Sequence, residues 1–367
     1  MNLRLILLMG LVSFFADWLY ESTRAVTPQF LEQLGASAFV VGLAFGVGDA
    51  LGYAARVLTG ALADKRGGYW METSLGYGLQ VAAVAGLIFA PSYIAVVFLV
   101  FLERFSKALR TPSRDVIVAS AGGDSFRGRA FGIHASLDQI GAVLGVFMAT
   151  YMLYIGLTPR DVYTMALVPG LAALVVLYIA YRQRTPLSSI RRVGGVKFGR
   201  EIAAFGVSQF LLGLSLVHIS LFMYRLSETA WLASLLYLVA MVAEIPASLL
   251  WGALYDRDAK ILLIAPPLSI ALAICFTHGG LFYFFSAAVI YSFIMAYADV
   301  AAKAYASRLG GASSLGYVGA MWGFGLAIGG VLYGYLWDVN ALDLVVLLPV
   351  IFASSAVFMI WKTINTS

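Results

Sequence analysis

The stretch Leu102–Asp115, LERFSKALRTPSRD, places six charged residues directly after the almost wholly apolar run 91–101. Charged residues make up only 12% of the chain, so their concentration here is unusual. The stretch is either a solvated loop or a helix that carries charge into surroundings where charge is costly. The remainder of the sequence decides between these two interpretations.

The composition indicates a membrane protein. Hydrophobic residues make up 61% of the 367 residues, the mean hydropathy is +0.89, and the charged fraction is about half of that in soluble domains. A soluble chain of this length could not bury so much apolar surface. The net charge of +5 fits basic loops beside a membrane, and we expect no nucleic-acid partner. A single cysteine, Cys275, excludes an intrachain disulfide and a thiolate metal cluster.

Twelve segments are long and apolar enough to cross a bilayer. They lie at approximately 4–30, 38–62, 70–90, 92–112, 128–156, 162–182, 201–223, 231–254, 260–278, 281–308, 315–337 and 342–362. Only the polar, basic linker at 182–200 separates them by more than a short connection,. We therefore predict an all-α polytopic fold of two pseudo-symmetric six-helix bundles, residues 1–183 and 201–367, joined by a cytoplasmic linker at 184–200.

The lysines and arginines support this count of spans. An even number of spans places both termini on one side, and nearly all basic residues between spans then fall on that side, except Arg160, Arg225 and, at the boundary, Arg24. The basic side of a membrane protein is cytoplasmic. We expect a multi-pass protein of the cell membrane with both termini in the cytoplasm.

The sequence also repeats itself at an offset of nearly 200 residues. GALADKR at 60–66 is echoed by GALYDR at 252–257, and the acid-base pair Glu103 and Lys107 by Asp299 and Lys303. Two homologous halves in a transporter place the substrate path near the bilayer midplane.

These motifs carry a resemblance. GALADKRGG at 60–68 resembles the signature G-x-x-x-D-[RK]-x-G of the major facilitator superfamily, and GALYDR resembles its second, degenerate copy. Arg104 falls where the family has an arginine in the fourth span. The runs RTPSRD and RGRAFG resemble a bacterial and archaeal branch without assigned substrates. The fifth span departs from the drug:proton antiporters of the family, because Gly141-x-x-x-Gly145 is not followed by proline.

The resemblance implies a cytoplasmic gate. In the family, the acid of the loop after span two braces that loop and stabilises the outward-open state. Carried over to this chain, with the charges at the end of span four, the gate comprises Gly60, Asp64, Lys65, Arg66, Arg110, Arg114, Asp115, Asp256 and Arg257. The opening stretch would then divide in two, with Glu103, Arg104 and Lys107 inside the membrane and the rest at the cytoplasmic exit.

Ionisable residues inside a membrane are costly and usually face one another within the bundle. Asp17 and Glu21 share a helical face with Arg24,, and we take them as the leading sites of protonation with Arg104 as their electrostatic switch. The proton-coupling candidates are Asp17, Glu21, Arg104, Asp49 and Asp138. The substrate-lining candidates are Trp18, Tyr53, Glu103, Lys107, His218, Glu244, Asp299 and Trp322.

Simpler interpretations stand beside these. The pairs Glu103–Lys107 and Asp299–Lys303 have the spacing of helical ion pairs that merely neutralise themselves, and the aromatic residues could pack the core or mark the membrane interface. His218 could equally be a hydrogen-bonded residue of the interior.

We expect a secondary transporter that moves a small solute by rocker-switch alternating access, with protons as the coupling ion and no other cofactor or metal. A facilitative uniporter or a proton-driven multidrug exporter would use the same fold. A non-transporting receptor or scaffold is disfavoured because no segment between spans is long enough for a soluble domain. Enzyme motifs are absent from the sequence, and we expect a monomer. The cargo and the direction of transport stay open.

Overall fold

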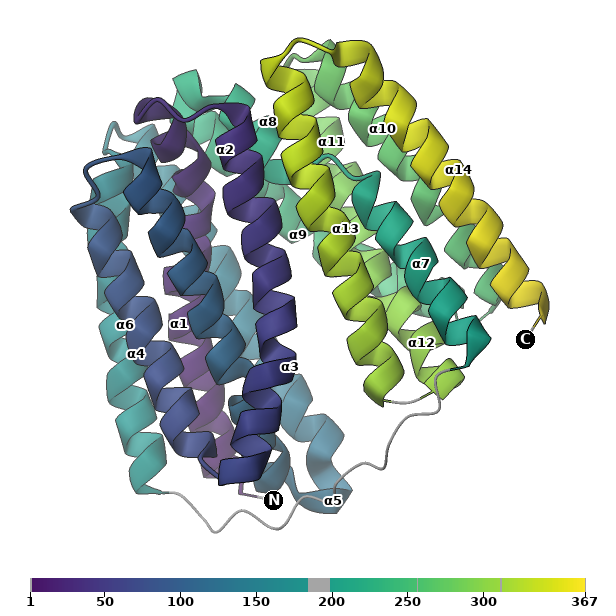
Figure 1. Ribbon diagram of the computed structural model, residues 1–367. Coiled ribbons are helices and arrows are strands. Elements are labelled where there is room, and N and C mark those ends of the chain that lie inside the picture. The colour runs from purple at the N-terminus through teal and green to yellow at the C-terminus, as the bar shows by residue number, and fades with distance from the viewer. Residues whose placement is uncertain (1, 184–198, 256, 311, 367) are drawn as a thin grey trace. The chain divides into compact units, whose positions relative to one another are not determined.

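The computed structural model describes residues 2–183, 199–255, 257–310 and 312–366. Helices follow one another along this described chain (Figure 1). The α-helices are α1 Leu3–Gln33, α2 Ala38–Gly42, α3 Gly48–Arg66, α4 Tyr69–Ile88, α5 Tyr93–Tyr154, α6 Pro159–Arg182, α7 Arg200–Leu214, α8 Ile219–Arg225, α9 Ala230–Tyr255, α10 Ala265–His278, α11 Leu281–Ala296, α12 Lys303–Gly310, α13 Ala312–Asp338 and α14 Leu342–Thr366. Within the described residues, nine helical segments are long and apolar enough to cross a membrane on length and composition alone.

The expected spans all fall on helical segments, but two contain π-helical turns. The turn Leu43–Val47 joins α2 to α3 and ends two residues before Asp49. The turn Tyr297–Ala302 joins α11 to α12 and contains Asp299. Such turns widen a helix locally and often occur at functional sites. The seventh span differs more, because it is interrupted between Leu214 and Ile219.

The longest helix corrects one expectation. A short connection was expected between the fourth span, 92–112, and the fifth, 128–156, whereas α5 is helical throughout its 62 residues. A straight helix of this length would measure about 93 Å, three times the hydrocarbon core of a bilayer. Arg114 and Asp138 both bond to Ser13 of α1, although a straight helix would hold them about 36 Å apart. The chain of α5 therefore doubles back on itself between these two residues without leaving helical conformation.

The chain packs as two compact units. Unit 1 contains α1, α4, α5 and α6, with residues 54–66 of α3 and residues 229–235. Unit 2 contains residues 35–53, α7, α8, the rest of α9 and α10 to α14. Compared with the predicted halves, residues 35–53 are grouped with unit 2 and residues 229–235 with unit 1. The boundaries of the two predicted halves stay a prediction.

In unit 1, the second half of α5 packs against α1 with little space between the backbones. Added Cβ atoms at Gly141 and Gly145 would meet the backbone of Phe14 and of Trp18. Small residues spaced by four allow membrane helices to approach in this way. The core around this contact is apolar and includes Leu5, Ile6, Met9 and Val12 of α1, Tyr77 of α4, Ile117 and Val118 of α5, and Leu177 of α6.

In unit 2, α2 and α13 approach one another equally closely. An added Cβ at Gly42 would meet the backbone of Gly330, and one at Gly334 would meet Ala38. The carboxylate of Asp338, the last residue of α13, accepts hydrogen bonds from the backbone N–H groups of Ala38 at 3.1 Å and Phe39 at 2.8 Å. Asp338 thus satisfies free N–H groups at the start of α2.

Candidate functional site

A row of basic residues on α5 faces α1 in unit 1. Arg104, Lys107, Arg110 and Arg114 are spaced by three or four residues, which places them along one side of a helix,. Opposite them, α1 contributes Asp17, which is only 4% exposed. Charge is therefore collected inside an apolar bundle, where an uncompensated ion would be costly.

Asp17 is held by two cations. The Arg110 guanidinium donates a hydrogen bond from Nη2 to Oδ1 of Asp17 at 3.2 Å, and Lys107 Nζ lies 3.7 Å from Oδ2. Arg110 is fully buried. Each oxygen of the carboxylate thus has its own basic partner, and the partners come from consecutive turns of α5.

Aromatic rings cover the same cations. Lys107 Nζ lies 3.8 Å from the centroid of the Tyr20 ring, and the guanidinium carbon of Arg104 lies 4.8 Å from the same centroid. The Arg110 guanidinium lies 4.3 Å from the centroid of Tyr77. These contacts stabilise positive charge where water is scarce.

A hydroxyl group connects this cluster to Asp138. Ser13 donates a short hydrogen bond to Oδ1 of Asp138 and accepts one from Nη1 of Arg114 at 3.3 Å. Arg114 also bonds Oδ1 of Asp115 from Nε at 3.0 Å and from Nη2 at 2.8 Å. The two arms of α5 therefore meet at one serine of α1.

Two further predicted acids lie buried in unit 1. Glu21 is 7% exposed and Glu103 is 2% exposed. Glu103 Oε2 lies 3.8 Å from Nη1 of Arg104, while Oε1 of Glu103 has no hydrogen-bond partner among the described residues. Lys107 makes an ion pair with Asp17, so its charge is shared with α1 and does not serve Glu103 alone.

Unit 2 brings together a second pair of predicted residues, Asp49 and His218. Nε2 of His218 lies 3.6 Å from Oδ2 of Asp49, and the histidine side chain is 1% exposed. His218 caps α8, because its Nδ1 accepts a hydrogen bond from the backbone N–H of Ser220 at 3.2 Å. An accepting Nδ1 in a neutral imidazole leaves the proton on Nε2. The N–H group of His218 therefore faces the carboxylate of Asp49.

The rings of Phe45 and Tyr291 flank this histidine. The ring centroid of Phe45 lies 6.1 Å from that of His218 in a stacked arrangement, and the ring of Tyr291 meets it edge-on at 6.0 Å. The pair forms where α7 breaks and directly after a π-helical turn. At the helix break and at the π-helical turn, backbone N–H and C=O groups near Asp49 and His218 do not follow the regular α-helical hydrogen-bond pattern.

The other predicted residues are dispersed. Asp299 and Lys303 pair with each other and are about half exposed, as the simpler reading expects. Glu244 is half-buried, Trp322 is 5% exposed, and Trp18 donates from its indole to the sulfur of Met148 at 3.4 Å. Arg257 is exposed. The surroundings of Gly60, the side chains of Tyr53, Asp64, Lys65 and Arg66, and the whole of Asp256 lie outside what the structure describes.

Arg110 lies elsewhere than predicted, and Ser13 was not among the predicted site residues. Arg110 was expected at the cytoplasmic exit, whereas it lies buried against Asp17. The regular spacing from Arg104 to Arg114 was the available signal, because it predicts one continuous basic face. Ser13 lies one turn before Asp17 on α1, and this spacing offered a weaker signal of the same kind.

Comparison with known proteins identifies relatives along the chain. An uncharacterised protein of Mycobacterium tuberculosis (strain ATCC 25618 / H37Rv) is 30% identical, with 94% of this chain and 89% of that protein covered. An uncharacterised MFS-type transporter of Methanocaldococcus jannaschii is 26% identical, with 60% of this chain and 56% of that protein covered.

Solved structures agree on the fold. A mutant form of the nucleoside transporter NupG superposes with a TM-score of 0.78 over 98% of this chain and 99% of that one, at 14% identity. At this identity the likeness concerns the fold alone. The sequence of residues 6–332 matches the family model of the Major Facilitator Superfamily. The chain therefore belongs to the Major Facilitator Superfamily and is a multi-pass membrane transporter of small molecules with the twelve-helix, two-domain fold, not an enzyme.

Proposed function

We propose that the chain is a proton-coupled secondary transporter that works by alternating access, and that Asp17 is its principal proton-binding residue. One observation carries the proposal: a buried carboxylate on α1 is held between two cations, Lys107 and Arg110, that α5 presents. Membership of the family supports transport, and the buried ion pairs of Asp17 support coupling of that transport to protons.

The physical argument concerns the cost of an unpaired ion. A carboxylate keeps its charge in a buried site only while cations or hydrogen-bond donors compensate it. Movement of α5 relative to α1 that withdraws Lys107 or Arg110 from Asp17 removes this compensation. The carboxylate then takes up a proton, and it releases the proton when the cations return.

Neighbouring acids extend this site. Asp138 reaches the same region of α1 through Ser13, and Glu21 lies one turn after Asp17. Ser13 carries a hydroxyl that can both donate and accept, so it is suited to pass a proton between Asp138 and its surroundings. The Asp49–His218 pair of unit 2 is a further place where a carboxylate and a base exchange partners during the cycle.

The cargo must be identified before coupling can be tested. We would first screen the purified protein for ligand-induced thermal stabilisation with sugars, amino acids, organic acids, amines and lipophilic drugs. The solute that stabilises the protein would then be supplied to proteoliposomes that contain a pH-sensitive dye. A solute gradient should drive proton movement in the natural protein.

Asp17→Asn should abolish this proton movement and retain solute exchange at equal concentrations, because the asparagine keeps the shape of the side chain without titrating. Asp343→Asn, at an exposed position in the first turn of α14, serves as the matched control and should behave as the natural protein does. Solute movement without proton movement in the natural protein would establish a facilitative uniporter. Undiminished coupling in both Asp17→Asn and Glu21→Gln would assign the proton to another residue.

A further inference from the structure

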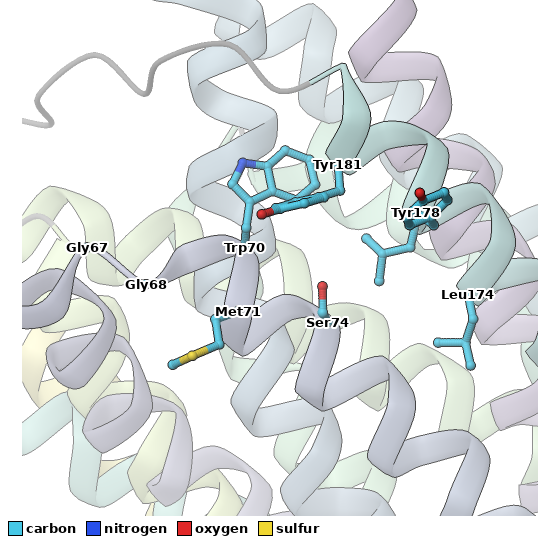
Figure 2. Close-up of a pocket in the computed structure, with 9 residues that line it drawn as sticks. Gly67, Gly68, Trp70, Met71, Ser74, Leu174, Tyr178 and Tyr181 are labelled. Carbon is cyan, nitrogen blue, oxygen red and sulfur yellow. The ribbon is translucent and has the colours of Figure 1, made fainter.

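A groove between α4 and α6 lies apart from the charged cluster. It has a volume of about 640 Å³ and is lined by Gly67, Gly68, Trp70, Met71, Ser74, Leu174, Leu177, Tyr178 and Tyr181. Figure 2 shows side chains of the two helices facing each other across it, with Trp70 and Tyr181 close together. Their rings meet edge-on at 5.7 Å. The groove thus has aromatic residues at the end where α6 terminates and aliphatic side chains beyond them.

Exposed apolar side chains around the groove indicate that this surface faces the bilayer. Leu75 on α4 and Val175 on α6 flank it and are 56% and 61% exposed. Large apolar side chains are exposed to this extent where lipid, rather than water, surrounds a protein. The end of the groove with Trp70 and Tyr181 lies at the turn between α3 and α4, which belongs to the predicted cytoplasmic side. Tryptophan and tyrosine concentrate at this level of a membrane.

The described lining of the groove is uncharged, and a basic side chain lies beside it. None of the described residues that line it is a carboxylate. Glu72, the nearest acid in sequence, is buried and accepts a hydrogen bond from Ser113 of α5 at 2.7 Å. Arg182, in the last turn of α6, lies exposed beside Tyr178 and donates to its hydroxyl at 3.4 Å. Among the described side chains, the Arg182 guanidinium thus lies next to Tyr178 at the edge of an apolar groove.

We propose that this groove binds an anionic phospholipid, with the phosphate at Arg182 and an acyl chain along Leu174, Leu177 and Met71. Arginine suits phosphate oxygens because its planar guanidinium can donate two parallel hydrogen bonds. Basic sites between membrane helices on the cytoplasmic side recognise lipid head groups in this manner. The proposal concerns the outer surface of unit 1, and it holds whether or not the transporter is coupled to protons.

Native mass spectrometry of the full chain in mild detergent tests the proposal. The probes are phosphatidylglycerol and phosphatidylcholine with identical acyl chains, so that the head group is the only difference between them. We expect the natural protein to prefer phosphatidylglycerol. Arg182→Gln should weaken phosphatidylglycerol binding roughly five-fold, which corresponds to the contribution of one basic side chain at an anionic surface. Arg182→Lys should retain part of the preference.

A second variant tests the groove itself. Ser74→Trp should fill the space between the helices and reduce the binding of both lipids, whereas Val168→Trp, at an exposed site on α6 away from the groove, should leave both unchanged. Circular dichroism and size-exclusion chromatography would verify that each variant is folded. The proposal is overturned if the natural protein shows no head-group preference, if Arg182→Gln keeps the full preference, or if Ser74→Trp binds lipid as the natural protein does.

Discussion

Arg110 illustrates how strongly a single buried cation depends on its partner. Its side chain is fully buried, and its Nε and Nη1 atoms have no hydrogen-bond partner among the described residues. The Asp17 carboxylate at 3.2 Å and the Tyr77 ring at 4.3 Å are the contacts that compensate its charge. A buried charge that loses its partner costs far more than the pair itself contributes.

We therefore expect Arg110→Met to lower stability by about 3–5 kcal/mol, because Asp17 then loses the nearer of its two ion-pair partners and keeps Lys107,. The double variant Asp17→Asn with Arg110→Met should recover much of this loss, since neither charge remains. Thermal unfolding followed by tryptophan fluorescence would rank the variants, with Arg257→Met at an exposed site as the control. Losses that simply add in the double variant would show that the two residues do not stabilise each other.

The sequence alone predicted that acidic residues lie inside the membrane at this site, but it predicted only some of the residues that pair with them. Asp17 and Glu21 interrupt an apolar run, which is visible in the sequence alone. The depth of Arg110 is set by packing, because Gly76 lets α4 approach so closely that an added Cβ would lie 2.6 Å from Cβ of Arg110. The partnership of Asp49 with His218 likewise depends on how α8 packs in unit 2, which no local pattern records.

Among the helices, the close contact between α1 and the second half of α5 requires a residue without a side chain at position 141. Gly141 faces the backbone of Phe14, and backbone cannot move aside as the end of a side chain can. We expect Gly141→Leu to push the two helices apart, and so to separate Ser13 from Asp138. The yield of monodisperse protein and its midpoint of thermal unfolding should both fall.

Gly78→Leu provides the matched control, because a Cβ added at Gly78 of α4 meets nothing within 4 Å. Leucine is also a better helix former than glycine, so this variant should be at least as stable as the natural protein. Equal stability of the two leucine variants would contradict the close approach of α1 and α5.

Hydropathy predicted where helices cross the membrane, but it did not predict how they are joined. Pro112 is the last residue of the predicted fourth span, and Gly122 and Gly123 lie between it and the fifth. These residues are typical of a turn, yet α5 continues through them as helix. The π-helical turns before Asp49 and around Asp299 were also invisible, because hydropathy reports the surroundings of side chains and not the spacing of backbone hydrogen bonds.

The orientation of the entire chain rests on its basic residues and can be tested with two positions. Leu157, between α5 and α6, and Arg257, which follows α9, are both exposed. Three predicted spans separate them, so an odd number of crossings should place them on opposite sides of the membrane. The excess of lysine and arginine assigns the side of Arg257 to the cytoplasm.

Replacing the buried Cys275 by alanine gives a background in which a single introduced cysteine can be labelled. In intact cells, a membrane-impermeant maleimide should label Leu157→Cys directly and Arg257→Cys only after the cells are permeabilised. The reverse pattern would invert the orientation and leave the number of spans unchanged. Labelling of both variants from the same side would require an even number of crossings between them, and one of the three intervening spans would then have to be withdrawn.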